Sequence, residues 1–266
     1  MKCPAHDIDG LKMTAQNRFL QLHGAHNVRD LGGCPLLSGG ATRWRSVLRG
    51  DSLLHLVPEA QARLVELGLR TVIDLRTSRE LERNPNPFAG HPQIAYHNIS
   101  LFSALAPVQV LIADGKPYDL PARYRQAVDF CQKQIAEVIT SVAEAREGAV
   151  LFHCSVGKDR TGVIAAILLS YVGVAPETVI GDYALSASAE ALLMKYREKS
   201  LAQGVAPDLT EASLACEPQT MRDMLLHIEA EHGGAANYLA KIGLRDGVLS
   251  KLRARLVAAQ PPPQNA

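Results

Sequence analysis

The segment AVLFHCSVGKDRTGVIAAILLSYV, residues 149–172, contains the pattern that decides the fold. Its beginning, Ala149–Cys154, is a short apolar run, which predicts a central buried strand. Residues Thr161–Val172 are apolar on nearly every face, which predicts a buried helix. The loop that joins the predicted strand to the predicted helix contains the most chemically informative residues of the chain.

Strands and helices alternate around this segment. Upstream, Thr71–Thr77 and Ile94–Ile99 are predicted strands, and Pro58–Gly68 is a predicted helix. Apolar residues at alternating steps of four and three predict one amphipathic helix from Ala122 to Glu147, ended by the glycine that follows. Beyond Pro176 the pattern is almost wholly helical. We therefore expect an α/β layer structure with a C-terminal helical extension.

The composition is that of an ordinary globular protein. The 266 residues include 28 Lys or Arg and 27 Asp or Glu, which give a net charge of +1, and 47% are hydrophobic. This balance argues against a disordered chain and against a nucleic-acid partner. The longest apolar stretch, around Val163–Ala175, is too short to cross a bilayer, so no membrane insertion is expected.

The cysteines indicate the compartment. There are five, an odd number, and none forms a CxxC pair. Such a set fits neither a disulfide framework nor a structural zinc site, which indicates a reducing, cytoplasmic location. Export by a leaderless route is the alternative.

The loop HCSVGKDRTG, residues 153–162, places a cysteine at the end of a strand and an arginine six residues later. A thiol at a helix N-terminus, ringed by backbone N–H groups and close to a guanidinium, favours the nucleophilic thiolate. The five residues between Cys154 and Arg160 can curl their amides around a tetrahedral dianion, with Gly157 permitting positive φ. Arg160 can donate two parallel hydrogen bonds to phosphate oxygens. The loop therefore predicts attack on a phosphate ester.

The same loop resembles the HC-x5-R-[ST] signature of the cysteine-dependent protein tyrosine and dual-specificity phosphatases. It is more similar still to the HCxxGKDRTG loop of an atypical bacterial tyrosine phosphatase family. The similarity extends over nearly the whole chain, to NVRDLGG at 27–33, LRGDSL at 48–53, VIDLRT at 72–77, DYALS at 182–186 and HGGAANYLAKIGL at 232–244. The fold it implies is α/β with a central, mostly parallel sheet flanked by helices and a C-terminal helical cap.

The resemblance implies a role for each residue of the loop. Cys154 is the nucleophile that forms a phosphocysteine, and Arg160 clamps the phosphate. His153 orders the loop, and the Thr161 hydroxyl hydrogen-bonds the sulfur as it leaves. The implied reaction has two steps and needs neither a metal nor a cofactor. The residues expected to bind phosphate are Ser155, Val156, Gly157, Lys158 and Thr161.

The leaving oxygen also needs a proton, so a carboxylic acid is expected on the side of phosphorus opposite the sulfur. Many relatives carry this acid on an upstream loop, where Asp114 and Asp119 are available. The GKDR subfamily indicates Asp159 instead. Asp74 is a further candidate, although a strand-end carboxylate of this kind also commonly pairs with a neighbour such as Arg76. We favour Asp159 and leave the others open.

The expected substrate is phosphotyrosine in proteins or peptides, with phosphoserine and phosphothreonine as further substrates. Lys158 is expected at the rim of the pocket, where basic residues of related phosphatases help to admit phosphoinositides. A lipid phosphatase is therefore the alternative function. A binding module without turnover and a redox-active thiol protein are two further alternatives.

The expected domain organisation is a single phosphatase domain over residues 1–258. Its α/β part covers about 15–185 and its helical part about 186–258, and a disordered tail follows over 259–266. Ser186–Thr220 is expected to form a helical cap over the pocket. Arg29 and Asp30 are expected to form an ion pair that braces the neighbouring loop.

Overall fold

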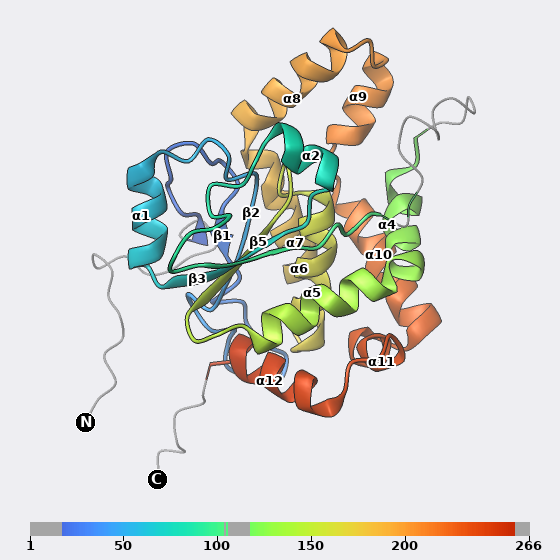
Figure 1. The fold of residues 1–266 in the computed structure, drawn as a ribbon. Coiled ribbons are helices and arrows are strands. Elements are labelled where there is room, and N and C mark those ends of the chain that lie inside the picture. Colours follow the sequence, from blue (N-terminus) through green and yellow to red (C-terminus); the bar gives the residue numbers. More distant parts are fainter. Residues whose placement is uncertain (1–17, 104, 106–117, 259–266) are drawn as a thin grey trace.

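The computed structural model describes residues 18–103, 105 and 118–258 and contains a central five-stranded sheet (Figure 1). In space the strands follow the order β1 (Arg29–Asp30), β2 (Val47–Gly50), β5 (Ala149–His153), β3 (Leu69–Asp74) and β4 (Ala95–Asn98). The pairing of β1 with β2 is antiparallel, and the other three pairings are parallel. The predicted α/β class with a mostly parallel central sheet is therefore confirmed.

The strand predicted at residues 149–154 is the middle strand of this sheet. Every residue of β5 is buried, as expected for an apolar run covered on both faces. Its last residue, His153, is aligned with Gly50 of β2 on one side and with Asp74 of β3 on the other. Because parallel strands end at the same edge of a sheet, the loop after β5 opens at the middle of that edge.

The sheet separates two hydrophobic clusters, because successive side chains of a strand point to opposite faces. Val150 and Phe152 of β5 belong to the larger cluster, whereas Leu151 belongs to the smaller one. The smaller cluster includes Ala60 and Leu64 of the first helix. The larger cluster joins β5 to the buried helix that follows it and to the last helices of the chain. The sheet and the last helices of the chain therefore share one hydrophobic core.

Helices cover both faces of the sheet (Figure 1). Helix α1 packs on one face, and α4 to α7 with α10 to α12 contribute to the larger cluster on the other. Their bounds are α1 (Pro58–Glu66), α2 (Ser78–Arg83), α4 (Leu120–Phe130), α5 (Gln132–Glu144), α6 (Asp159–Tyr171), α7 (Pro176–Ala184), α8 (Glu190–Ala202), α9 (Pro207–Leu214), α10 (Pro218–His232), α11 (Ala235–Lys241) and α12 (Asp246–Leu256).

The helix predicted from Ala122 to Glu147 is two helices, so the prediction of one continuous helix is wrong. Cys131, with φ −101° and ψ 25°, ends α4 and begins α5. Both helices bury apolar side chains in the same cluster, so the apolar spacing continues across the break. Helix α5 ends at Glu144, and Gly148 lies in the following loop with φ +118°.

Helices α8 and α9 form a pair that projects from the body of the molecule beside α2 (Figure 1). Helix α2 was not predicted from the sequence, whereas α8 and α9 lie within Ser186–Thr220, which was expected to be helical. At its base, α8 places Leu192 in a small buried cluster with Val156 of the loop after β5. Across the described ranges of the chain, none of the helices combines the length and the apolarity that a membrane span requires.

Candidate active site

The loop after β5 is held in place by hydrogen bonds that its backbone carbonyl groups accept from other segments. The carbonyls of Ser155, Val156 and Gly157 each accept a hydrogen bond from an upstream segment. The donors are the Ser52 amide at 3.1 Å, the Asn27 side-chain amide at 3.0 Å and the Arg49 guanidinium at 2.7 Å. Across the described residues, no hydrogen bond donated by the amides of residues 155–158 is found. These amides and the first turn of α6 are therefore left to bind an anion.

Gly157 is required by this geometry. Its φ is +75°, and a Cβ built there would lie 2.7 Å from the carbonyl of Gly50 and 2.8 Å from the Asp51 nitrogen. Both contacts are with backbone, which cannot move aside as a flexible side chain would. Thr161 is fully buried nearby and its hydroxyl donates to the Gly50 carbonyl at 3.4 Å. The loop is therefore packed tightly against the end of β2.

Arg49, which donates to the Gly157 carbonyl, belongs to a buried network of charged side chains. Asp182 of α7 pairs with Arg18 at 3.0 Å, with Arg29 at 3.2 Å and with Arg49 at 2.5 Å. Burial raises the pKa of the Asp182 carboxyl, but the three guanidinium groups outweigh burial and hold that pKa well below its usual range. Asp182 thus keeps Arg49 in place behind the loop.

Arg29 and Asp30 do not form the ion pair that the sequence suggested. The Asp30 carboxylate accepts from the backbone amides of Gly32 at 2.8 Å and of Arg45 at 2.7 Å. Consecutive residues of a strand point to opposite faces, so the Arg29 guanidinium lies on the other side of β1. The expectation of a local pair is therefore wrong, and Asp182 is the partner of Arg29.

The Glu80 carboxylate binds the two terminal nitrogens of the Arg160 guanidinium. Nη1 and Nη2 donate to the two Glu80 oxygens at 2.7 and 2.9 Å, and Nη2 also donates to Ser155 Oγ at 3.1 Å. Burial lowers the pKa of Arg160, but Glu80 and a Cys154 thiolate outweigh burial and raise it. No partner of Arg160 Nε is found among the described residues, so this edge of the guanidinium can donate to an oxyanion.

Glu80 is a site residue that the sequence analysis missed. It lies in the first turn of α2, where Thr77 and Glu80 form a reciprocal capping box. The Glu80 carboxylate also accepts from Ser155 Oγ at 2.6 Å, so α2 is tied directly to the loop. The pattern Thr77-x-x-Glu80 after a strand is a recognisable helix start, although it does not reveal the partner 80 residues away.

We expect Glu80→Gln to remove a pH-dependent part of the stability. Burial raises the pKa of Glu80, but Arg160 and Ser155 outweigh burial and lower it to about 2 from its ordinary 4.5. A carboxylate with a lowered pKa stabilises the fold fully above pH 4.5 and progressively less as the pH falls toward 2. Melting temperatures of the two proteins should differ at neutral pH and converge over that acidic range.

The matched control for this prediction is Glu82→Gln, at an exposed position of the same helix. This variant should follow the wild-type protein at every pH. A difference between Glu80→Gln and wild type that stays constant from neutral pH down to pH 2 would contradict the stabilising role of the Glu80–Arg160 pair.

Lys158 lies inside the protein and not at the rim, so that expectation is wrong. It is 1% exposed, and its Nζ donates to the carbonyls of Ser213 at 2.7 Å and Ala215 at 2.8 Å. The last carbonyls of a helix lack partners within the helix and attract a cation, which explains this position at the end of α9. Nζ also lies 3.3 Å from Asp159 Oδ1.

His153 and Asp74 are fully buried beneath the loop. The Asp74 carboxylate accepts from Arg76 at 2.7 Å and from Asn86 at 2.9 Å, and it lies 3.3 Å from His153 Nε2. The other ring nitrogen of His153 is 3.1 Å from the Cys154 carbonyl oxygen. Burial raises the pKa of Asp74, but His153 and Arg76 outweigh burial and hold it well below its usual range. The predicted pairing of Asp74 with Arg76 is confirmed.

The other candidate acids lie in different surroundings. Asp159 is the first residue of α6, its side chain is 30% exposed, and its carboxylate accepts from the Tyr124 hydroxyl at 2.8 Å. Asp119 is exposed and caps α4 by accepting from the Ala122 amide at 2.8 Å. Asp114 lies outside the described residues, as does the predicted tail 259–266.

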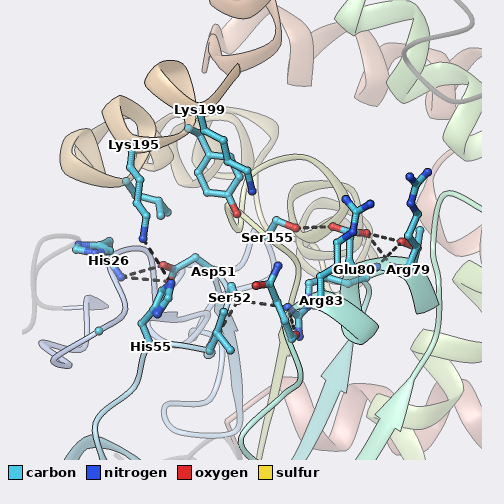
Figure 2. A pocket seen from close by; sticks show the side chains of 17 residues that line it. His26, Asp51, Ser52, His55, Arg79, Glu80, Arg83, Ser155, Lys195 and Lys199 are labelled. Carbon is cyan, nitrogen blue, oxygen red and sulfur yellow. Dashed lines mark hydrogen bonds between the residues drawn. The ribbon is translucent and has the colours of Figure 1, made fainter. Parts of the chain in front are cut away.

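A cavity of about 440 Å³ opens beside the loop, between α8 and α2 (Figure 2). Ser155 lines it from the loop, and Arg79, Glu80 and Arg83 line it from α2. From α8 it is lined by Leu192, Lys195, Tyr196 and Lys199. Burial and the charge of Cys154 both raise the pKa of Tyr196, a site residue with no sequence signal. The Cys154 thiol itself is only 2% exposed.

The geometry of the loop after β5 can be compared with that of known protein families. A sequence model described as the tyrosine phosphatase family matches residues 20–258. The chain belongs to this family and is a protein tyrosine phosphatase by class.

Individual relatives agree with this assignment. A tyrosine-protein phosphatase of Nostoc commune is 30% identical over 219 residues, which cover 79% of this chain and 73% of that protein. The triple specificity protein phosphatase PtpB of Mycobacterium tuberculosis is 25% identical over 277 residues, covering 89% and 98% respectively. The solved structure of P. aeruginosa TpbA in complex with pTyr has a TM-score of 0.33 and 16% identity over 55% of this chain and 76% of that chain, which adds nothing to the assignment.

Proposed function

We propose that the enzyme hydrolyses phosphotyrosine in proteins through a phosphocysteine intermediate. The observation that carries the proposal is the loop itself. Cys154 directly follows the central strand, the next amides lack protein partners within the described residues, and Nε of Arg160 has no partner there. A tetrahedral dianion bound by these groups would bring phosphorus close to the sulfur.

The proposed reaction has two displacement steps. First, the Cys154 thiolate attacks phosphorus, so that an S–P bond forms as the bond to the tyrosyl oxygen breaks, and that oxygen takes a proton from Asp159. Water then attacks phosphorus, Asp159 takes a proton back, and the S–P bond breaks to release inorganic phosphate and the thiolate. The amides and Arg160 stabilise the charge of the equatorial oxygens in both steps.

The depth of the thiol supports tyrosine as the main substrate. Cys154 is 2% exposed beside a cavity walled by α8 and α2. A phosphate must therefore be carried down to the sulfur on a long side chain. Phosphotyrosine is longer than phosphoserine or phosphothreonine, so we expect the shorter residues to be slower substrates.

Of the described carboxyl groups, Asp159 suits the role of general acid best. It is partly exposed and it begins the helix that carries Arg160. Asp74 is fully buried, and its lowered pKa leaves it without a proton to donate. Asp119 already accepts a hydrogen bond from the backbone of its own helix.

Asp159→Asn is therefore expected to lower kcat about 100-fold or more for aryl phosphates with poor leaving groups. The reason is that a poor leaving group needs the donated proton, whereas a nitrophenolate does not. The measurement is kcat for a series of aryl phosphates of increasing leaving-group pKa. Asp119→Asn is the matched control, because asparagine caps helices equally well, and its slope should equal that of wild type. A steeper slope for Asp119→Asn than for Asp159→Asn would reverse the assignment.

Phosphoinositides are the second candidate substrate class, favoured by the positive charge at the cavity. This charge comes from Arg79, Arg83, Lys195 and Lys199, which line the cavity, and not from Lys158 as the sequence suggested. One relative is named a triple specificity phosphatase, which also supports testing several classes. The inositide headgroup is polyanionic and would be attracted to such a wall.

The test of the proposed function is a comparison of kcat/KM on phosphotyrosyl, phosphoseryl and phosphothreonyl peptides of one sequence and on phosphoinositides in micelles. We expect the phosphotyrosyl peptide to give the highest value. A higher value on phosphoinositides would assign the lipid function instead. Retained phosphate affinity without turnover on any substrate would assign a binding module.

The cysteines support a cytoplasmic location as part of this proposal. Within the described residues, Cys34, Cys154 and Cys216 are free thiols. Free thiols persist in a reducing compartment, and a thiolate nucleophile depends on one.

A further inference from the structure

Two histidines and an aspartate meet on the side of the molecule where α4 packs against α10. Asp129 lies near the end of α4, and His227 and His232 lie in the last turns of α10. His227 Nε2 is 2.8 Å from Asp129 Oδ1, and His232 Nε2 is 3.8 Å from the same oxygen. One ligand atom from each residue lies within 4.8 Å of the other two. None of the three belongs to the phosphatase site proposed above.

His232 gives an independent indication that something is bound here. Both of its ring nitrogens are buried, and neither has a hydrogen-bond partner within the described part of the chain. Its side chain is 12% exposed, and the Tyr238 ring lies edge-on at 4.9 Å between centroids. A buried imidazole normally pairs its nitrogens, because leaving them unpaired costs free energy. A cation held by one nitrogen removes part of that cost.

The spacing of the three groups suits a small tetrahedral cation. Zinc binds imidazole nitrogen and carboxylate oxygen at about 2.0–2.2 Å, which separates neighbouring ligand atoms by about 3.4 Å in a tetrahedron. The two distances from Asp129, 2.8 and 3.8 Å, bracket that separation. His227 and His232 are separated by four residues, within the H-x3–5-H spacing of structural zinc sites.

We propose that Asp129, His227 and His232 bind one Zn²⁺ ion, with water as the fourth ligand. The mixed nitrogen and oxygen donors favour zinc over magnesium or calcium, which prefer oxygen alone. The bound ion joins the ends of α4 and α10. Nearby, the Tyr238 hydroxyl of α11 donates to the Val128 carbonyl of α4 at 2.8 Å. The site is structural, and it takes no part in the proposed phosphoryl transfer.

The test uses the full chain without an affinity tag, stripped of metal with a chelator. Cys154→Ser serves as the background, so that zinc on the nucleophilic thiol is not counted. Equilibrium dialysis against Zn²⁺ with elemental analysis should give about one ion per chain, and Zn²⁺ should raise the melting temperature. Cobalt(II) substitution should give the visible absorption of a tetrahedral site without sulfur-to-metal charge-transfer bands.

Ligand variants locate the ion. In this background, His232→Phe, which keeps an aromatic ring against Tyr238, and Asp129→Asn should each weaken zinc binding by about 100-fold or more, since loss of an outer-shell partner alone costs 10–100-fold. His97→Gln, at an exposed position of β4, should bind zinc as the background does. Circular dichroism of the metal-free forms checks that the variants fold. If His232→Phe does not fold, zinc binding by Asp129→Asn alone tests whether these residues are the ligands.

Three results would overturn the proposal. The first is zinc binding that stays well below one ion per chain. The second is binding that neither His232→Phe nor Asp129→Asn weakens. The third is a cobalt spectrum with strong sulfur charge-transfer bands, because it would place the ion on a cysteine. None of these results bears on the phosphatase function, since turnover is not measured.

Discussion

Cys154→Ser is expected to abolish phosphatase turnover while the protein still binds phosphate. A serine hydroxyl is not ionised at neutral pH and is a far weaker nucleophile than a thiolate, so the first displacement should fail. We expect kcat to fall by about 10⁴-fold or more, as for other enzymes that lose their nucleophile. The amides of residues 155–158 and the Arg160 guanidinium are unchanged by the substitution, so affinity for the dianion should remain.

Phosphate release from a phosphotyrosyl peptide and calorimetric binding of the same peptide together test this expectation. Cys216→Ser is the matched control, because it makes the same chemical change at a partly buried thiol that donates to the Leu214 carbonyl. That variant should turn over as wild type does. Appreciable turnover by Cys154→Ser would exclude the phosphocysteine mechanism.

Arg160→Lys is expected to lower kcat/KM by about 100- to 1000-fold although the charge is kept. The guanidinium satisfies two partners at once, because its end pairs with both Glu80 oxygens and its side edge is left for phosphate. An ammonium is a single point charge and cannot hold Glu80 and two phosphate oxygens in one plane. The loss should therefore appear in both kcat and phosphate affinity.

Steady-state kinetics on an aryl phosphate provide the measurement, with inorganic phosphate as a competitive inhibitor to report affinity. Arg63→Lys, at an exposed position of α1 away from the cavity, is the control and should behave as wild type. Near wild-type kcat/KM for Arg160→Lys would show that a positive charge alone suffices, and the proposed clamp would be wrong.

The sequence revealed the parts of the site that are contiguous. The strand Ala149–His153, the loop and the start of α6 follow one another, and each has its own local pattern of apolar or polar residues. Such local patterns reflect burial and backbone geometry, which neighbouring residues largely determine. The alternation of strands and helices around the loop could therefore be predicted from local patterns, whereas the mostly parallel sheet was implied by the resemblance to the phosphatases.

Contacts between distant segments could not be predicted in this way. Glu80 reaches Arg160 across 80 residues, and Lys158 reaches Ala215 across 57. Arg160 and Lys158 could be recognised in the loop motif, but their partners could not. The partners depend on how separate helices pack, and a local sequence pattern does not determine that packing. The zinc ligands Asp129 and His227, 98 residues apart, show the same limit.

The position of Lys158 has a consequence for how this enzyme can be divided or redesigned. The pair α8 and α9 has the outline of an accessory insertion that could be exchanged or deleted. Yet its last carbonyls, those of Ser213 and Ala215, solvate an ammonium that the catalytic loop buries. A shortened chain would remove both carbonyl acceptors and leave the ammonium 3.3 Å from the carboxylate of Asp159, the proposed acid. We therefore expect that grafting either the α8–α9 pair or the loop into a relative requires transferring both.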